Sequence, residues 1–214
     1  MNLFFLVILN TFFLFCPISY ASENCPLEMI FVPEGEFSAG DSSNFKIVFT
    51  DSFCIDVTEI IQKKYKKIIG ENPSYFQGPR HPVETVSWYQ ASQYCHILNK
   101  RLPTEWEWEK AAKSKSSTKY FWGNKIDSSY LWYADNSGFR THSVALKKPN
   151  SFGLYDISGN VYEWTSSWDD DIDKKFKVLR GGSWANRQNS VRSAYRDRAS
   201  PYEYGSDVGF RCVK

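Results

Sequence analysis

Four cysteines, spread over almost the whole 214-residue chain, constrain its fold more than any other feature of the sequence. They are Cys25, Cys54, Cys95 and Cys212, and a fifth, Cys16, lies in an apolar segment at the N-terminus. In an oxidising compartment an even number of cysteines predicts disulfides, here two. Three pairings are possible, and a set of buried free thiols is the alternative. Disulfides that close long loops would stabilise a chain of this kind.

The N-terminal segment indicates that the chain reaches such a compartment. Residues 1–21, MNLFFLVILNTFFLFCPISYA, carry no charged side chain, and their apolar stretch stops at Cys16, which is short for a bilayer of about 30 Å. Ser19 and Ala21 place small residues where a signal peptidase reads, although the start lacks Lys and Arg. We expect a signal peptide over 1–21, cleaved after Ala21, and an exported, periplasmic or secreted protein without a membrane span. A retained anchor and a buried N-terminal element are the alternatives.

The composition predicts that residues 22–214 form one globular domain. The chain is 42% hydrophobic and 23% charged, and no long linker, repeat or low-complexity stretch divides these residues. Its 26 basic and 24 acidic side chains give a formal net charge of +2. This charge gives no electrostatic basis for binding nucleic acid.

A helix in the middle of the chain is the clearest secondary-structure prediction. In VSWYQASQYCHILNKR (86–101), Ser87 can cap the helix, and apolar residues follow it at spacings of three, four and three. These spacings define one helical face. Cys95 lies on that face and is therefore expected to point inward.

The next segment, RLPTEWEWEKAA (101–112), predicts a second, short helix. Thr104 stands three residues before Glu107, which is the spacing of a capping box. Glu105 and Glu109 share a face at i, i+4, and we interpret them as a solvated surface rather than a pair of catalytic carboxylates.

Outside the two central helices, the sequence indicates short strands and much irregular loop structure. The segments MIFVPEGEF (29–37) and FKIVFTDSFCID (45–56) alternate or cluster apolar residues between Gly, Asp and Ser breaks. Further along the chain, Gly, Asn, Ser and Pro recur every few residues. The expected fold class is therefore α+β.

Seven segments resemble the formylglycine-generating enzyme (sulfatase-modifying factor) family in their order and spacing. They are MIFVPEGEFSAGD (29–41), FCIDVTEI (53–60), HPVETVSWYQASQYC (81–95), RLPTEWEWEKAA (101–112), FGLYDISGNVYEWTSSW (152–168), RGGSW (180–184) and VGFRCVK (208–214). The resemblance covers roughly residues 28–214 and implies the C-type-lectin-like fold of that family. It also implies that Cys95 pairs with Cys212, which leaves Cys25 to pair with Cys54.

The resemblance breaks down at the family's catalytic cysteines. The founding activity is copper-dependent oxidation of a sulfatase cysteine to formylglycine, carried by two cysteines just after a GGS motif. Here GGSWANRQNSVRSAYRDRAS (181–200) contains no cysteine, and Asn186 stands where the resemblance places the first copper ligand. Copper(I) is a soft ion that prefers thiolates, so we do not expect copper in this chain. Iron is not indicated either, because His81, His96 and His142 show no metal-binding spacing.

A ligand groove beside the lost cysteines is a further implication of the resemblance. Its residues in this chain would be Tyr162, Ser183, Trp184, Asn186 and Arg196. Trp and Tyr supply large rigid contact areas and Arg a planar array of donors, so the groove suits a peptide or protein ligand. The alternative is that these residues pack or satisfy the backbone.

A calcium site is implied in DISGNVYE (156–163). By resemblance, Asp156 and Glu163 would bind through their side chains, and Gly159 and Val161 through their carbonyls. Oxygen ligands of this kind suit a hard cation such as Ca²⁺. Turn and capping roles are the alternative for the two acids.

These observations favour a binding or accessory module over an enzyme. The first hypothesis is an exported member of the family without copper-dependent cysteine oxidase activity. The alternative is a periplasmic metal-dependent oxidoreductase of the sulfatase-maturation or siderophore-maturation type, with ligands from His142, Asp207 or nearby acids. A third hypothesis is an envelope protein that uses the fold for protein contacts.

Overall fold

The structure, a computed structural model, describes residues 25–41 and 43–214. The elements are β1 (Met29–Val32), β2 (Gly35–Asp41), β3 (Asn44–Thr50), β4 (Phe53–Asp56), α1 (Gln62–Ile69), α2 (Trp88–Ile97), α3 (Glu105–Lys113), β5 (Tyr162–Trp168), β6 (Lys177–Arg180), β7 (Arg196–Ala199) and β8 (Val208–Gly209). Residues 114–161 contain turns, bends and isolated bridges but no helix or strand. The expected α+β class, with short strands and much irregular structure, is confirmed.

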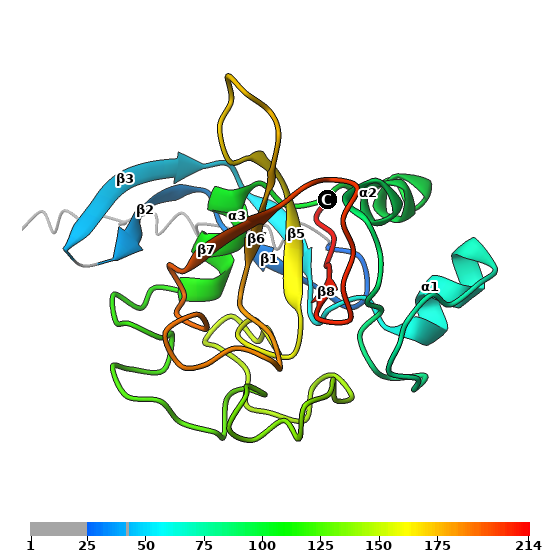
Figure 1. The fold of residues 1–214 in the computed structure, drawn as a ribbon. Coiled ribbons are helices and arrows are strands. Elements are labelled where there is room, and N and C mark those ends of the chain that lie inside the picture. The colour runs from blue at the N-terminus through cyan, green and yellow to red at the C-terminus, as the bar shows by residue number, and fades with distance from the viewer. Residues whose placement is uncertain (1–24, 42) are drawn as a thin grey trace, which may run out of the picture.

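Three small sheets organise the chain. β1 pairs with β4, and β2 pairs with β3 in a hairpin, both antiparallel. The third sheet has the order β7-β6-β5-β8, in which only β5 and β8 run parallel. The hairpin and α1 lie at opposite sides of the molecule in Figure 1, with the four-stranded sheet between them. No helix among the described residues is long and apolar enough to cross a membrane.

The main hydrophobic core lies between α2 and the four-stranded sheet. Tyr94 of α2, Trp164 of β5 and Phe210 are almost fully buried there. Cys95 also belongs to this core, as its inward position on the helix predicts. Burial of such large apolar side chains supplies the main driving force for the fold.

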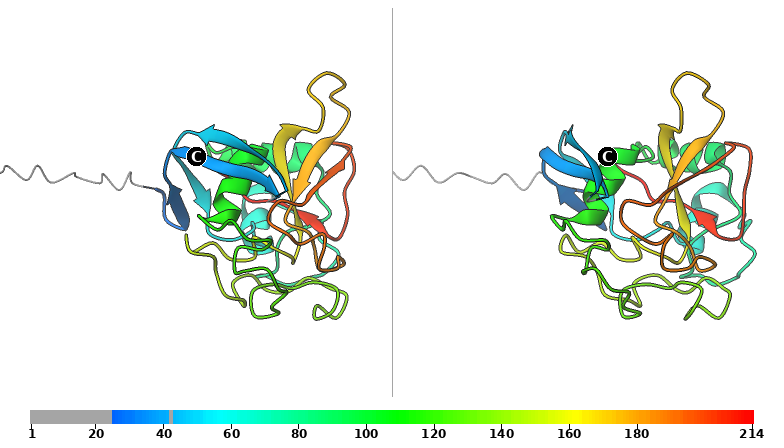
Figure 2. Two further views of the ribbon diagram at one scale, coloured as in Figure 1. Left: turned by 90° about the vertical axis from the view of Figure 1, so that its left-hand side faces the viewer. Right: turned by 60° about the vertical axis from the view of Figure 1, so that its left-hand side comes forward.

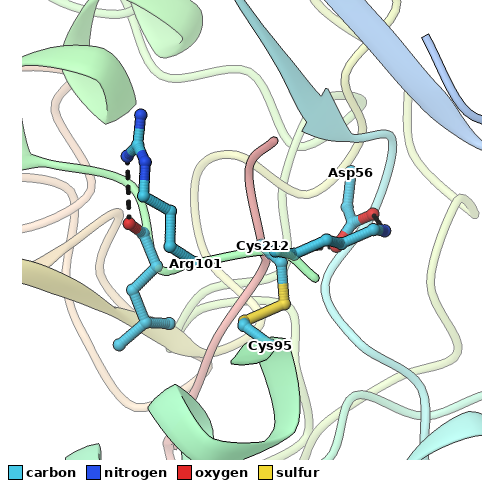
Figure 3. The surroundings of a disulfide bond; sticks show 6 residues. Asp56, Cys95, Arg101 and Cys212 are labelled. Atoms are coloured by element: carbon cyan, nitrogen blue, oxygen red, sulfur yellow. Dashed lines mark hydrogen bonds and ion pairs between the residues drawn. A yellow bond between two sulfur atoms is a disulfide. The ribbon is translucent and has the colours of Figure 1, made fainter. Parts of the chain in front are cut away.

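Two disulfides cross-link the domain, one in its N-terminal part and one at its C-terminal end. Cys95 pairs with Cys212, and Cys25 pairs with Cys54, so both expected pairings are confirmed. The first joins α2 to the C-terminal segment (Figure 3), where the N–H of Cys212 also donates to the Asp56 carboxylate (2.9 Å). Residues 1–24 lie outside the described part, so the signal peptide over 1–21 stays a prediction.

Both expected helix starts are confirmed in atomic detail. Ser87 and Gln90 form a reciprocal capping box at α2, and Thr104 and Glu107 form one at α3. Each box satisfies backbone N–H groups that the first helical turn leaves without partners.

The structure corrects one sequence interpretation and adds a helix. Glu105 and Glu109 are not solvated, since only 3% and 1% of their surfaces are exposed. The short strands expected within 29–37 and 45–56 are present as β1 to β4. α1 was not predicted; Ile61 at its start offers no side-chain cap, and Gly70 ends it in the left-handed conformation typical of a helix C-terminus.

Candidate ligand-binding site

A tight turn after β6 places Ser183 and Asn186 at the centre of the candidate site. Gly181 and Gly182 both have positive φ, and a Cβ at Gly182 would lie 2.6 Å from the Ser190 carbonyl oxygen. Only glycine fits this geometry without strain. The Ser183 N–H donates to Asn186 Oδ1 (2.8 Å), and the Ser183 hydroxyl oxygen lies 2.8 Å from the same atom. The Asn186 amide therefore braces the turn that carries Ser183.

The segment Ser206–Asp207 joins three of the expected groove residues. The Tyr162 N–H donates to the Asp207 carbonyl (2.8 Å), and the Trp184 Nε1–H donates to the Ser206 carbonyl (3.0 Å). The Ser183 hydroxyl oxygen lies 3.3 Å from the Asp207 carboxylate. Tyr162, Ser183, Trp184 and Asn186 thus lie close together, and a ligand groove formed by them stays a prediction.

Burial perturbs the ionisable groups at and near this site. Burial is the main cause that raises the Tyr162 pKa, and the Asp197 carboxylate raises it further. Burial also raises the pKa of Asp207, which the nearby Asp197 carboxylate raises further and a hydrogen bond from Ser183 lowers. Glu84 is fully buried, and its pKa is likewise raised by burial.

Glu84 positions the loop that packs against Trp184. Its carboxylate accepts hydrogen bonds from the Phe76 N–H (2.7 Å) and the Thr85 hydroxyl (2.7 Å). The Phe76 ring packs edge-to-face on Trp184, with 5.4 Å between the centroids. Thr85 itself has a φ of 62°, which is strained for a β-branched residue.

Two exposed tyrosines adjoin these residues, and the sequence analysis did not identify them. They are Tyr75 and Tyr204, which expose 74% and 67% of their surfaces. We call this pair the tyrosine rim. The Tyr75 ring contacts the Phe76 ring that packs on Trp184, and Tyr204 stands two residues before Ser206, whose carbonyl accepts from the Trp184 indole N–H. The S-P-Y-E-Y-G-S-D segment (200–207) was the available signal, because it joins Tyr204 to Ser206 and Asp207.

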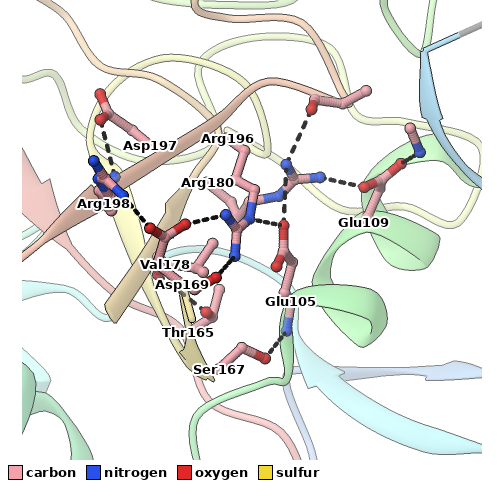
Figure 4. A network of polar contacts seen from close by, with 12 residues as sticks. Glu105, Glu109, Thr165, Ser167, Asp169, Val178, Arg180, Arg196, Asp197 and Arg198 are labelled. Carbon is pink, nitrogen blue, oxygen red and sulfur yellow. Dashed lines mark hydrogen bonds and ion pairs between the residues drawn. The ribbon is translucent and has the colours of Figure 1, made fainter. Parts of the chain in front are cut away.

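Arg196 is not brought to this site through its guanidinium. It donates instead to Glu105 (2.7 Å) and to Asp169, which also binds Arg198 (Figure 4). Glu105 in turn lies 3.7 Å from Arg180, and Arg180 donates to Glu109 (2.5 Å). The arginine belongs to a structural ion network between α3 and β6–β7.

The expected calcium segment is buried, and its two acids have different surroundings. Asp156 Oδ2 accepts from the Ala145 N–H (2.7 Å), whereas its Oδ1 is buried without a partner. Both Glu163 oxygens accept from the Arg211 guanidinium, and one also accepts from the Trp108 Nε1–H (2.7 Å). The free Asp156 Oδ1 could therefore bind a cation, whereas Glu163 would first have to give up its hydrogen bonds to Arg211. Calcium at Asp156, Gly159, Val161 and Glu163 stays a prediction.

His81 and His142 have structural partners, and the four cysteines of the described residues form disulfides. His81 Nδ1 lies 3.1 Å from the Thr141 hydroxyl oxygen, and His142 Nε2 lies 2.7 Å from the Ser137 carbonyl oxygen. The His142 ring stacks on Trp132 at 3.8 Å. In residues 25–41 and 43–214, no three His, Cys, Asp or Glu side chains converge as a metal site would require.

Comparison with known proteins agrees with this architecture. The inactive Cα-formylglycine-generating enzyme 2 of Bos taurus is 38% identical over 62% of this chain and 50% of its own length. The formylglycine-generating enzyme of Bos taurus is 35% identical over 67% of this chain and 46% of its own. The solved structure of Treponema denticola variable protein 1 superposes with a TM-score of 0.80 at 30% identity, covering 86% of this chain and 94% of that one.

The family assignment rests on a match that spans nearly the whole chain. The chain spans between 38% and 50% of the length of several curated relatives, including the two bovine proteins, so it corresponds to one part of each of them. The model of the sulfatase-modifying factor enzyme 1-like domain matches residues 18–214. This chain therefore belongs to the formylglycine-generating enzyme (sulfatase-modifying factor) family and has its C-type-lectin-like fold.

Proposed function

We propose that this chain is an exported binding module of its family, without copper-dependent cysteine oxidase activity. Its ligand is a peptide or protein segment that contacts Trp184 and the tyrosine rim. The observation that carries the proposal is the role of Asn186, whose amide braces Ser183 at the position where a copper-binding thiolate is expected. An amide is a poor ligand for Cu(I).

The state of the remaining thiols supports the same proposal. The four cysteines of the described residues are consumed in two disulfides, and both lie away from the 181–186 turn in sequence. A disulfide sulfur offers no thiolate to a metal. The cysteine pairs also support export, because structural disulfides persist in oxidising compartments.

The surface of the site suits recognition. Tyr and Trp side chains supply a large contact area at a small entropic cost, and they are enriched where proteins bind ligands. Trp184 is held from several sides, because its indole N–H donates to Ser206 and its carbonyl accepts from the Ser137 hydroxyl (2.9 Å). A rigid indole beside exposed phenols is the arrangement of a preformed binding surface.

Two experiments test the two parts of the proposal. For the catalytic part, the purified protein is incubated with a synthetic CxPxR-type sulfatase peptide, copper and a reductant, and the peptide is followed by mass spectrometry. We expect the cysteine to stay unchanged, whereas its conversion to formylglycine would refute the proposal.

For the binding part, the immobilised protein selects from a displayed random-peptide library. We expect wild type to enrich defined sequences and the Trp184→Ala variant to lose at least tenfold of their binding. The matched control is Ile172→Ala, which removes an apolar side chain that is 93% exposed on a different loop. Equal binding by wild type and Trp184→Ala would place recognition elsewhere.

A further inference from the structure

The β2–β3 hairpin leaves one strand edge open. β2 and β3 form a two-stranded sheet, and no other strand of the described residues pairs with β3. The hairpin extends along one side of the molecule, away from the four-stranded sheet (Figures 1 and 2). An open edge presents unpaired N–H and C=O groups that can accept a further strand.

An apolar stripe runs along this open strand. Phe45, Ile47 and Phe49 point to the same face of β3, and each exposes 57% or 58% of its surface. The alternate residues face the body of the protein instead. The Lys46 ammonium lies 4.0 Å from the Trp106 ring centroid of α3, and Thr50 accepts a hydrogen bond from Lys110 (2.9 Å).

The usual features that prevent strand association are missing from β3. It contains no proline, and its register with β2 continues without a bulge from Thr50 to Asn44. Its single charged residue is Lys46, whose ammonium lies over the Trp106 ring of α3 and therefore does not interrupt the apolar stripe. Charges, prolines and bulges are the common ways in which proteins protect an edge.

We propose that two copies of this chain associate through antiparallel pairing of their β3 strands about a two-fold axis at Ile47. In this register Ile47 meets Ile47 of the second copy, and Phe45 meets Phe49 of the second copy. Lys46 lies opposite Val48 of the second copy, so no like charges meet. The strand NFKIVFT is therefore complementary to itself, which a symmetric two-fold interface requires.

The exposed area sets the strength of this association. Each of the three side chains keeps roughly 100 Å² exposed, so two copies would bury at most roughly 600 Å² of apolar side-chain surface, because the face of the extended sheet still meets solvent. With the strand backbones added, the interface stays below about 1,200 Å², the lower end of stable complexes. The dimer is therefore weak and forms as the protein concentration rises through the micromolar range.

Sedimentation velocity over a series of protein concentrations tests this dimer with the full mature chain. Wild type is expected to shift from monomer to dimer, and Ile47→Lys and Ile47→Glu are each expected to stay monomeric, because identical charges would meet at the axis. An equimolar mixture of the two variants is expected to restore the dimer, since Lys then meets Glu. Ile172→Lys, on a different exposed loop, is the matched control and should dimerise like wild type.

Three results would overturn the proposal. They are a wild type that stays monomeric throughout, an Ile47→Lys variant that dimerises like wild type, and a mixture that does not associate. Circular dichroism of each variant verifies folding, which is expected to be unaffected because Ile47 is exposed. The outcome is independent of the ligand-binding proposal.

Discussion

Replacing Arg211 with methionine is expected to destabilise the fold by about 3–5 kcal/mol, the range for breaking a buried ion pair. Arg211 is fully buried, and its guanidinium donates to Glu163 at 2.8–3.0 Å and to three main-chain carbonyls. Without it, Glu163 would stay buried beside Glu59 and Asp156 with no guanidinium. In the native protein, burial is the main cause that raises the Glu59 pKa well above its usual value, and the carboxylates of Asp156 and Glu163 raise it further.

Thermal unfolding compares this effect with the loss of an arginine that is half exposed. In a domain of this size, about 3–5 kcal/mol corresponds to a Tm lower by about 6–20 °C. The control is Arg101→Met, because Arg101 also makes two 2.6 Å bonds to a carboxylate, that of Glu107, but exposes 52% of its side chain, whereas the Glu107 side chain exposes 11%. Water screens the charge of the half-exposed arginine, so Arg101→Met should lower the Tm by less than Arg211→Met does.

A double variant separates the lost pair from lost packing. Arg211→Met combined with Glu163→Met removes both charges, and we expect it to be more stable than Arg211→Met alone. The reasoning would be refuted if Arg211→Met lowered the Tm no more than Arg101→Met does. A double variant less stable than Arg211→Met alone would show that packing, rather than the unpaired charge, determines the loss.

Three further predictions concern pH, cross-links and calcium. Burial lowers the pKa of Lys177 to about 8, so on raising the pH the folded state loses this proton before the unfolded state does. The free energy of unfolding should therefore rise between about pH 8 and 10.5. Urea unfolding of the Lys177→Met variant should show no such rise. Replacing Cys95 and Cys212 with serine should reduce the free energy of unfolding by about 5 kcal/mol, because this disulfide joins residues 117 positions apart. Replacing Cys25 and Cys54, which are 29 positions apart, should reduce it by about 3.5 kcal/mol. Urea unfolding of the two variants should give the losses in this order. Elemental analysis of protein purified without chelators should find calcium near one equivalent per chain with no copper or iron, and its absence would remove the calcium prediction.

Features determined by neighbouring residues could be predicted from the sequence. Both capping boxes join residues three positions apart, so the pattern itself contains both partners. The burial of Glu105 and Glu109 could not be predicted in this way, because their arginine partners, Arg196 and Arg180, lie 91 and 71 positions along the chain. On a helix considered alone, two glutamates at i, i+4 do indicate a solvated face.

The candidate site shows the same division between local and distant information. Ser183, Trp184 and Asn186 belong to one turn, so their proximity follows from the sequence itself. The tyrosine rim combines positions 75 and 204, which only the folded chain brings to the same site. Arg196 was assigned to the groove by its position in the motif, but the carboxylates of Glu105 and Asp169 hold its guanidinium in the ion network.

The family resemblance places a copper-binding cysteine at position 186, where this chain has asparagine. The turn after β6 needs an acceptor for the Ser183 N–H, and Asn186 supplies that acceptor through its amide oxygen. An asparagine oxygen is a strong acceptor, whereas a cysteine sulfur is a weak one. Asn186 therefore strengthens the turn while removing a soft metal ligand. Under the proposed function, the turn that Asn186 braces also carries Trp184, which packs on Phe76 beside the tyrosine rim.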